Sequence, residues 1–128
     1  GPLGIGPYAG KEDEVFEAWR KSVTALAECP NVTAKLGGLV MEVNGHHWED
    51  LSKPPTSQEL MERTRRYFET TIGLFGVDRC MFESNFPVDM IAGTYNTCWN
   101  AFKRLTADYS DAEKAALYHD TATRVYRI

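Results

Sequence analysis

The chain has 128 residues, of which 43% are hydrophobic and 25% are charged, and its formal net charge is −4. This length supports one domain with a core of its own rather than two. The negative charge argues against a nucleic-acid surface, which needs clustered Lys and Arg. No segment reaches the ~18 apolar residues of a membrane span and no signal peptide is visible, so we expect a cytoplasmic protein without a membrane partner.

The cysteines are three in number and contain no C-x-x-C pair: Cys29, Cys80 and Cys98. An odd number without metal-ligand spacing favours buried free thiols in a reducing compartment over disulfides or a zinc site.

The first half of the chain predicts a helix, a strand and a long loop. Residues 1–10 are rich in Gly and Pro and predict a loop. Residues 11–29 carry apolar side chains at three- and four-residue spacing, which indicates an amphipathic helix that ends before Pro30. Residues 31–39 alternate as a strand, and residues 40–55 contain the turn and breaker residues of a loop.

The second half predicts a helix, a second strand and further helices. Thr56 and Glu59 have capping-box spacing at the start of a helix that we expect to end at Gly76. Residues 79–86 form an apolar run without clean alternation, which is typical of a strand buried on both faces. A short loop over 90–94, a helix over 95–105, a capping box at Ser110–Glu113 and a last helix capped by Thr121 complete the chain.

This order predicts two parallel strands joined by a helical crossover. Two parallel strands cannot cover their own faces, because parallel sheets are nearly always buried on both sides. The sequence therefore resembles an arc cut from a larger α/β structure.

The candidate site lies where the second strand ends. Glu83 and Asn85 are two residues apart and so share one face of the strand, and Asp89 follows shortly after. In α/β proteins functional groups gather at the carboxyl ends of strands. On the neighbouring strand, Lys35 shares a face with Gly37, so Lys35 and Glu83 are expected to meet as a buried ion pair.

Alternatives stay open for each of these side chains. Glu83 is either the neutralised partner of Lys35 or a group that moves substrate protons. Asp89 either belongs to the site or caps the following turn.

His46, His47 and Trp48 lie in the long loop. Two adjacent histidines cannot easily face one metal ion, since metal sites use spaced ligands. We therefore interpret them as part of a solvated loop or of a lid that covers a small-molecule substrate, and we expect no metal ligand in this segment.

Four stretches carry a family resemblance: residues 1–4 (GPLG), 31–39 (NVTAKLGGL), 79–87 (RCMFESNFP) and 121–127 (TATRVYR). Together they resemble the C-terminal part of the amidohydrolase superfamily, in its lactonase-like and decarboxylase-like branch. The resemblance implies an α/β fold in which residues 1–128 are a single partial domain, the arc of about strands 7 and 8 of a (β/α)8 TIM barrel.

The resemblance also implies a set of functional residues, several of which this chain lacks. The family places histidines on its first, fifth and sixth strands, and this chain lacks them, so a divalent metal such as zinc belongs to the full-length protein and none is expected for this chain alone. Where the family usually has an aspartate at the end of the eighth strand, this chain has Asn85, and a neutral amide is no general base and a poor metal ligand.

The resemblance thus predicts a segment of a metal-dependent or water-activating hydrolase acting on a lactone-type cyclic ester or amide, or on a carboxylated substrate. Gly37, Gly38, Glu83, Asn85 and Asp89 would line the site, and the isolated chain would be inactive. The alternatives are a decarboxylase or hydratase of the same superfamily, or a non-catalytic module that forms a homo-oligomer through its exposed strand edges.

Overall fold

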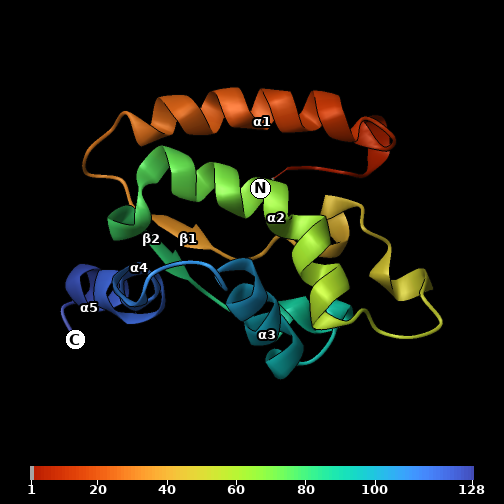
Figure 1. Ribbon diagram of the computed structural model, residues 1–128. Helices are drawn as coiled ribbons and strands as arrows, with labels where there is room; N and C mark the ends of the chain where they lie inside the picture. The colour runs from red at the N-terminus through yellow and green to blue at the C-terminus, as the bar shows by residue number, and fades with distance from the viewer. Residues whose placement is uncertain (1) are drawn as a thin grey trace.

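The structure is a computed structural model that describes residues 2–128 (Figure 1). Its regular elements are α1 (Glu12–Ala27), β1 (Ala34–Leu36), α2 (Ser57–Phe75), β2 (Cys80–Phe82), α3 (Tyr95–Leu105), α4 (Asp111–Ala115) and α5 (Thr121–Tyr126). A π-helical turn over Ala116–Asp120 joins the last two helices, and short 3-10 turns punctuate the loops. No helix within residues 2–128 is long and apolar enough to cross a lipid bilayer.

The two strands pair in parallel, as the sequence predicts, but over fewer residues than expected. The paired residues are Ala34 with Cys80, Lys35 with Met81, and Leu36 with Phe82. One further backbone bond, from Glu83 N to Leu36 O at 3.2 Å, extends the ladder toward the carboxyl ends. All three residues of β2 are buried, which agrees with its unbroken apolar pattern.

Local capping signals place most helix ends correctly. The capping boxes Thr56–Glu59 and Ser110–Glu113 both form, and α2 ends at Gly76, whose φ of 78° suits glycine. Thr121 is not the cap of α5 as expected: it is the first residue of the helix, it is buried, and its hydroxyl donates to the Val77 carbonyl oxygen at 3.4 Å.

Two other expectations also need correction. The segment 90–94, expected as a loop, begins inside a 3-10 turn over Val88–Ala92. Cys80 and Cys98 are buried free thiols as predicted, whereas Cys29, just beyond α1, is exposed. The part of the 1–4 motif that falls on Gly1 lies outside the described residues.

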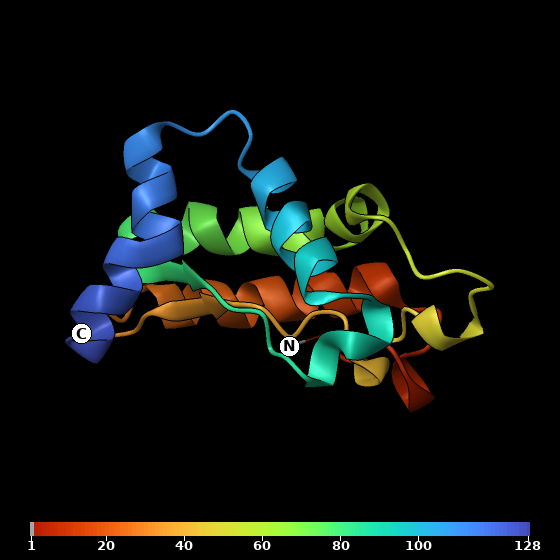
Figure 2. The ribbon, with the colours of Figure 1, turned by 90° about the horizontal axis from the view of Figure 1, so that it is seen from below.

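The core lies between β2, α2 and α3. Phe82 stacks on Phe102 with ring centroids 4.4 Å apart, and Phe68 meets Phe102 edge-on at 5.6 Å. The helices α4 and α5 gather at one end of the strand pair, and the turn Val88–Ala92 lies at the other (Figure 2). This layout leaves the carboxyl ends of the strands free of the C-terminal helices.

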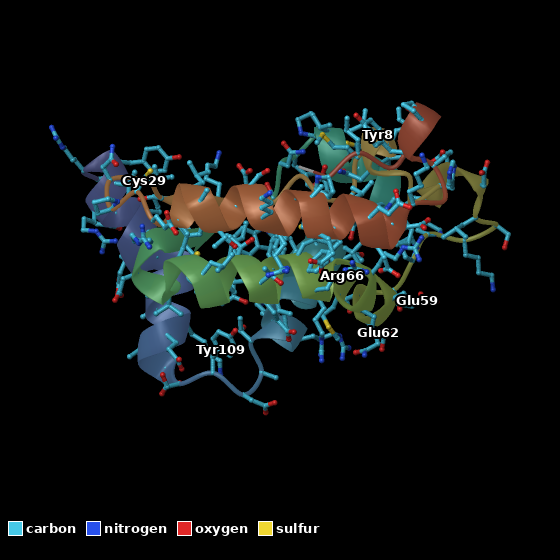
Figure 3. All side chains as sticks on the ribbon, turned by 90° about the horizontal axis from the view of Figure 1, so that it is seen from above. Tyr8, Cys29, Glu59, Glu62, Arg66 and Tyr109 are labelled. Carbon is cyan, nitrogen blue, oxygen red and sulfur yellow. The ribbon has the colours of Figure 1, made fainter. Side chains whose placement is uncertain are left out.

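The helix α1 contributes no buried residue to the core. It runs alongside α2, and Arg66 of α2 joins the two helices by an ion pair to Asp13 at 3.0 Å and by contact with the Phe16 ring (Figure 3). None of the residues of α1 is fully buried, and Leu26 on its apolar stripe is 48% exposed. Within residues 2–128 the sheet has two strands only, so one edge of β1 is unpaired.

Candidate functional site

The carboxyl ends of β1 and β2 bring the predicted site residues together. Gly37 packs on Glu83, and Gly38 lies against Asn85: a Cβ placed on Gly38 would be 3.4 Å from Asn85 Nδ2. Gly38 also has a φ of +69°, which favours glycine. The two glycines that end β1 therefore allow the chain after β2 to approach within van der Waals contact.

Lys35 and Glu83 form the expected ion pair, with Nζ and Oε2 2.5 Å apart. The hydrogen bond from Lys35 to Glu83 raises the pKa of the lysine. The pair is not buried as expected, because the two side chains are 50% and 27% exposed. The reason is topological: within residues 2–128 no further strand covers this face of the sheet.

Asn85 and Asp89 form a second polar pair beside the first. Asn85 Nδ2 donates to Asp89 Oδ1 at 2.8 Å, and the Asp89 backbone N–H donates to the Asn85 carbonyl oxygen at 3.2 Å. Asn85 has a φ of 52°, a left-handed conformation that asparagine adopts more readily than most residues. The turn from 85 to 89 is thus closed by both side chain and backbone.

Asp89 is the buried carboxylate of the site, at 4% exposure. It lines a small cavity with Gly37, Gly38 and Cys98, and the nearby Gly38 backbone N–H favours the charged form of its carboxylate. Burial raises the pKa of the Asp89 carboxyl, and the bonds from Asn85 and Gly38 partly offset that effect. Asp89 therefore connects the segments that follow the two strands.

The His46 side chain is partly buried, and both of its ring nitrogens are hydrogen-bonded within the protein. Its Nε2 bonds to the Leu39 carbonyl oxygen at 2.8 Å, and its Nδ1 accepts from Arg63 Nε of α2 at 3.1 Å. The carbonyl can only accept, so the ring proton lies on Nε2. Burial lowers the pKa of His46, which keeps the ring neutral.

Trp48 is also partly buried, and its ring lies 5.3 Å from the His46 ring. Its short 3-10 turn, Trp48–Asp50, contacts the turn Val88–Ala92 that follows the candidate site. The loop thus lies against the site-bearing turn. Arg63, which fixes the loop to α2, was missed by sequence reasoning, because a contact between a helix side chain and a residue distant in the sequence leaves no local signal.

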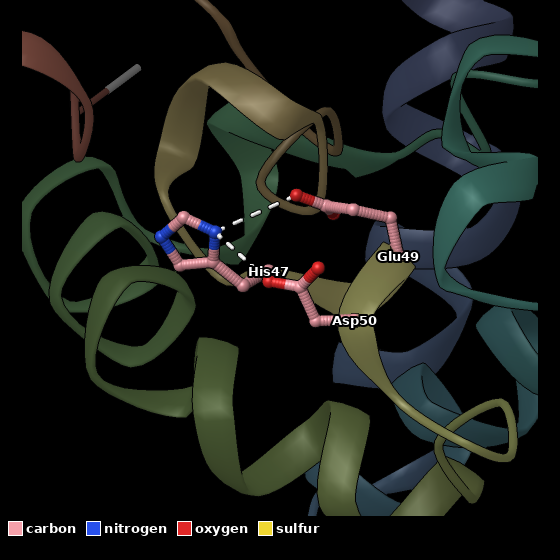
Figure 4. A group of neighbouring side chains, drawn as sticks. All are labelled: His47, Glu49 and Asp50. Atoms are coloured by element: carbon pink, nitrogen blue, oxygen red, sulfur yellow. Dashed lines mark ion pairs between the residues drawn. The ribbon is translucent and has the colours of Figure 1, made fainter.

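His47 joins an exposed group with Glu49 and Asp50 (Figure 4). His47 Nδ1 lies 3.5 Å from Glu49 Oε1 and 3.7 Å from Asp50 Oδ2. Within residues 2–128 these are the only three His, Cys, Asp or Glu side chains close enough together to share a metal ion. Glu49 and Asp50 were not singled out from the sequence, although their spacing from His47 places all three on one tight turn.

Comparison with known proteins identifies the family. The sequence model of the family described as "Amidohydrolase" matches residues 3–128. The chain belongs to the amidohydrolase family. The resemblance seen in the sequence motifs is thereby confirmed, including its position in the C-terminal portion.

Relatives of this amidohydrolase chain are much longer than it is. It is 44% identical over 113 residues to the uncharacterized protein y4mH of Sinorhizobium fredii, covering 88% of this chain and 34% of the relative. It is 29% identical over 119 residues to an L-fucono-1,5-lactonase of Burkholderia multivorans, covering 92% of this chain and 38% of that enzyme. The chain thus spans little more than a third of the curated relatives it matches.

Solved structures agree with the sequence comparison. A crystal structure of a Burkholderia multivorans amidohydrolase with bound zinc superposes with a TM-score of 0.77 at 28% identity, covering 91% of this chain and 39% of that one. A second crystal structure, with bound HEPES, gives a TM-score of 0.79 over 93% of this chain and 39% of that one. The fold is therefore a mixed α/β part of an amidohydrolase TIM barrel.

The strand-end residues of this chain do not form a zinc site by themselves. Glu83 is paired with Lys35, Asp89 is held by Asn85 and Gly38, and both ring nitrogens of His46 are already bonded. Zinc favours thiolate, imidazole and carboxylate ligands, whereas the unpaired atom at Asn85 is an amide oxygen, which is a poor zinc ligand.

Proposed function

We propose that this chain forms the arc of strands 7 and 8, within a single partial domain, of an amidohydrolase-type hydrolase that opens a lactone-type cyclic ester or amide or acts on a carboxylated substrate. The observation that carries the proposal is the clustering of Lys35, Glu83, Asn85 and Asp89 at the carboxyl ends of adjacent parallel strands. Catalytic groups of TIM barrels lie at this end. The two L-fucono-1,5-lactonases among the relatives support a cyclic ester as the substrate.

The hydrolysis adds water across the ester bond. The water oxygen bonds to the acyl carbon, the ring carbon–oxygen bond breaks, and the leaving oxygen takes a proton. Glu83 is the partly exposed carboxylate placed to move that proton, and Lys35 beside it stabilises negative charge that develops on the substrate. The remaining members of the active site lie on other strands of the barrel, so the isolated chain is inactive.

The test compares the 128-residue chain with the full-length protein that carries it, using 1,5-lactones of sugar acids and a pH indicator that reports acid release. Hydrolysis by the full-length protein and none by the chain is expected. Release of carbon dioxide without ring opening would replace the hydrolase with a decarboxylase. Lactone hydrolysis by the chain alone would contradict the proposal.

A substitution tests the role of Glu83 in the full-length protein. We expect Glu83→Gln to lower kcat by about 10²-fold, the usual contribution of a general acid or base. Glu14→Gln is the matched control, because Glu14 is an exposed carboxylate in the first turn of α1. Equal activity of Glu83→Gln and the control would remove Glu83 from the chemistry.

A further inference from the structure

The orientation of the Asn85 amide follows from its partner. An ionised carboxylate only accepts hydrogen bonds, so the Asn85 atom 2.8 Å from Asp89 Oδ1 is the NH2 group and not the carbonyl oxygen. Asp89 is 4% exposed and its backbone N–H donates to the Asn85 carbonyl oxygen, so its carboxylate stays beside the Asn85 amide. The amide is therefore held in one of its two orientations.

This orientation leaves the Asn85 carbonyl oxygen open. Oδ1 has no donor among residues 2–128, yet it is not one of the enclosed polar atoms that lack a partner there. It is accordingly reachable from solvent beyond the carboxyl end of β2. The Asn85 amide oxygen is unpaired, the Glu83 carboxylate is paired with Lys35, and both groups are hydrogen-bond acceptors.

We propose that Asp89 is a positioning residue that turns the Asn85 carbonyl oxygen toward the substrate, and that Asn85 thereby selects a substrate carrying a hydroxyl or N–H donor beside its reactive group. The proposal rests on the proposed function for the identity of the site, and it revises the role expected for Asp89, which reaches the substrate only through Asn85. A substrate without the donor leaves the desolvated Asn85 oxygen unpaired, and sites built in this way reject such analogues.

The residue type at 89 decides the orientation. In Asp89→Asn, one of the two carboxylate oxygens is replaced by an NH2 group, which donates a hydrogen bond instead of accepting one. Asn85 is the side chain to which residue 89 is hydrogen-bonded, so we expect the Asn85 amide to turn over, accept with its oxygen and present its NH2 group to the substrate. Asp89→Asn therefore reverses the polarity of the site with little change of volume.

The first experiment uses the 128-residue chain and the ¹⁵N-edited NMR signals of the Asn85 side-chain amide. In the parent chain we expect one NH2 proton to exchange about tenfold more slowly than the other, because one is bonded to Asp89. The difference should vanish in Asp89→Ala, where the partner is absent. Asp108→Asn, at an exposed loop position, is the matched control and should leave the signals unchanged. Equal, fast exchange of both protons in the parent chain would overturn the proposal.

The second experiment uses the full-length protein and combines calorimetry, which measures the Kd of each lactone, with steady-state kinetics, which separate KM from kcat. A hydroxylated lactone should bind about tenfold more tightly than its deoxy analogue, and Asp89→Asn should remove the preference by raising KM with little change in kcat. A large fall in kcat with KM unchanged would make Asp89 catalytic and overturn the positioning role. Binding preference without turnover would defeat the proposed hydrolase function but keep this inference, whereas turnover without preference would defeat this inference alone.

Discussion

Gly37 lies so close to Glu83 that a Cβ on residue 37 would stand 2.3 Å from Glu83 Cγ and 2.6 Å from the Glu83 carbonyl oxygen. The second of these atoms belongs to the backbone and cannot move aside alone. The absence of a side chain at position 37 is thus the condition for the two strands to bring Glu83 to the site edge beside Lys35.

Gly37→Ala is expected to destabilise the fold by about 1–3 kcal/mol, because it overpacks a contact with backbone. The measurement is urea unfolding of the 128-residue chain followed by circular dichroism. Gly73→Ala is the matched control: Gly73 lies inside α2 with nothing within 4 Å of its added Cβ. It should stabilise by about 0.5–1 kcal/mol, since alanine is the better helix former. An unchanged midpoint for Gly37→Ala would show that the strand ends separate easily.

The Asn85–Asp89 contact predicts the effect of placing a carboxylate at position 85, where the family usually has an aspartate. In Asn85→Asp, a second carboxylate would stand where the Asn85 NH2 group now lies, 2.8 Å from Asp89 Oδ1. Because two negative charges at that distance repel each other, the pKa of one of the two carboxyl groups would be strongly raised. A raised carboxyl pKa in the folded state contributes stability that is present at low pH and is lost as the pH rises through that pKa. We expect the variant to be less stable than the parent by about 1–3 kcal/mol at pH 7 and to recover below pH 5. Unfolding curves at the two pH values give the answer, and equal losses at both would point to a steric cause.

Sequence reasoning located most of the fold because the decisive signals were local. The capping boxes, the apolar periods of α1 and α2 and the terminal Gly76 each act within a few residues. The parallel pairing and the gathering of Glu83 and Asn85 at the strand ends followed from general rules of α/β topology.

The features that were missed depend on segments far apart in the chain. Arg79 donates to the carbonyl oxygens of Ala27, Cys29 and Phe75, and so connects α1 and α2 to the start of β2. Exposure of the Lys35–Glu83 pair likewise depends on which strands are present around it. Neither the partners of an arginine nor the cover of a sheet face leaves a periodic trace in the sequence.

Thiol reactivity should separate the three cysteines. Burial raises the pKa of Cys80 to about 12 and that of Cys98 to about 11, so both stay protonated and unreactive at neutral pH. Cys29 is exposed. We expect Ellman's reagent to modify one thiol of the folded chain rapidly and all three after denaturation, and Cys29→Ser to abolish the rapid phase. A rapid reaction that survives Cys29→Ser would mean that the core opens readily.

His46 predicts a loss of stability on acidification. Its pKa is lowered in the folded chain by burial, so the unfolded chain binds the proton more tightly. The stability contribution is complete above its ordinary pKa of about 6.5 and is lost as the pH falls through the lowered value. Protonation would also put a hydrogen on Nδ1, which now accepts from Arg63.

The measurement is the unfolding midpoint between pH 7.5 and 5 for the parent chain and two variants. His46→Ala should cost about 1–3 kcal/mol at pH 7.5, because it leaves the Leu39 and Arg63 groups unpaired, and it should weaken the pH dependence. His119→Ala is the control, since His119 is exposed and bonds only to its neighbour Asp120. A pH dependence that follows His119 instead would contradict the assignment.

The uncovered side of α1 and the unpaired edge of β1 lead to the last prediction. Trp19, Val23 and Leu26 of α1 line an apolar groove together with residues of β1, and Leu26 is half exposed there. Because the Leu36 carbonyl faces β2, the backbone groups of Lys35 and Gly37 face the open edge. We propose that the isolated chain covers this side with a second copy of itself, since an unpaired strand edge beside exposed apolar surface promotes association.

Sedimentation at increasing concentration should therefore show a dimer or larger species. Leu26→Lys should shift it toward monomer, whereas Lys21→Ala, on the opposite, solvated side of α1, should not. A stable monomer at all concentrations would contradict the exposed-edge argument.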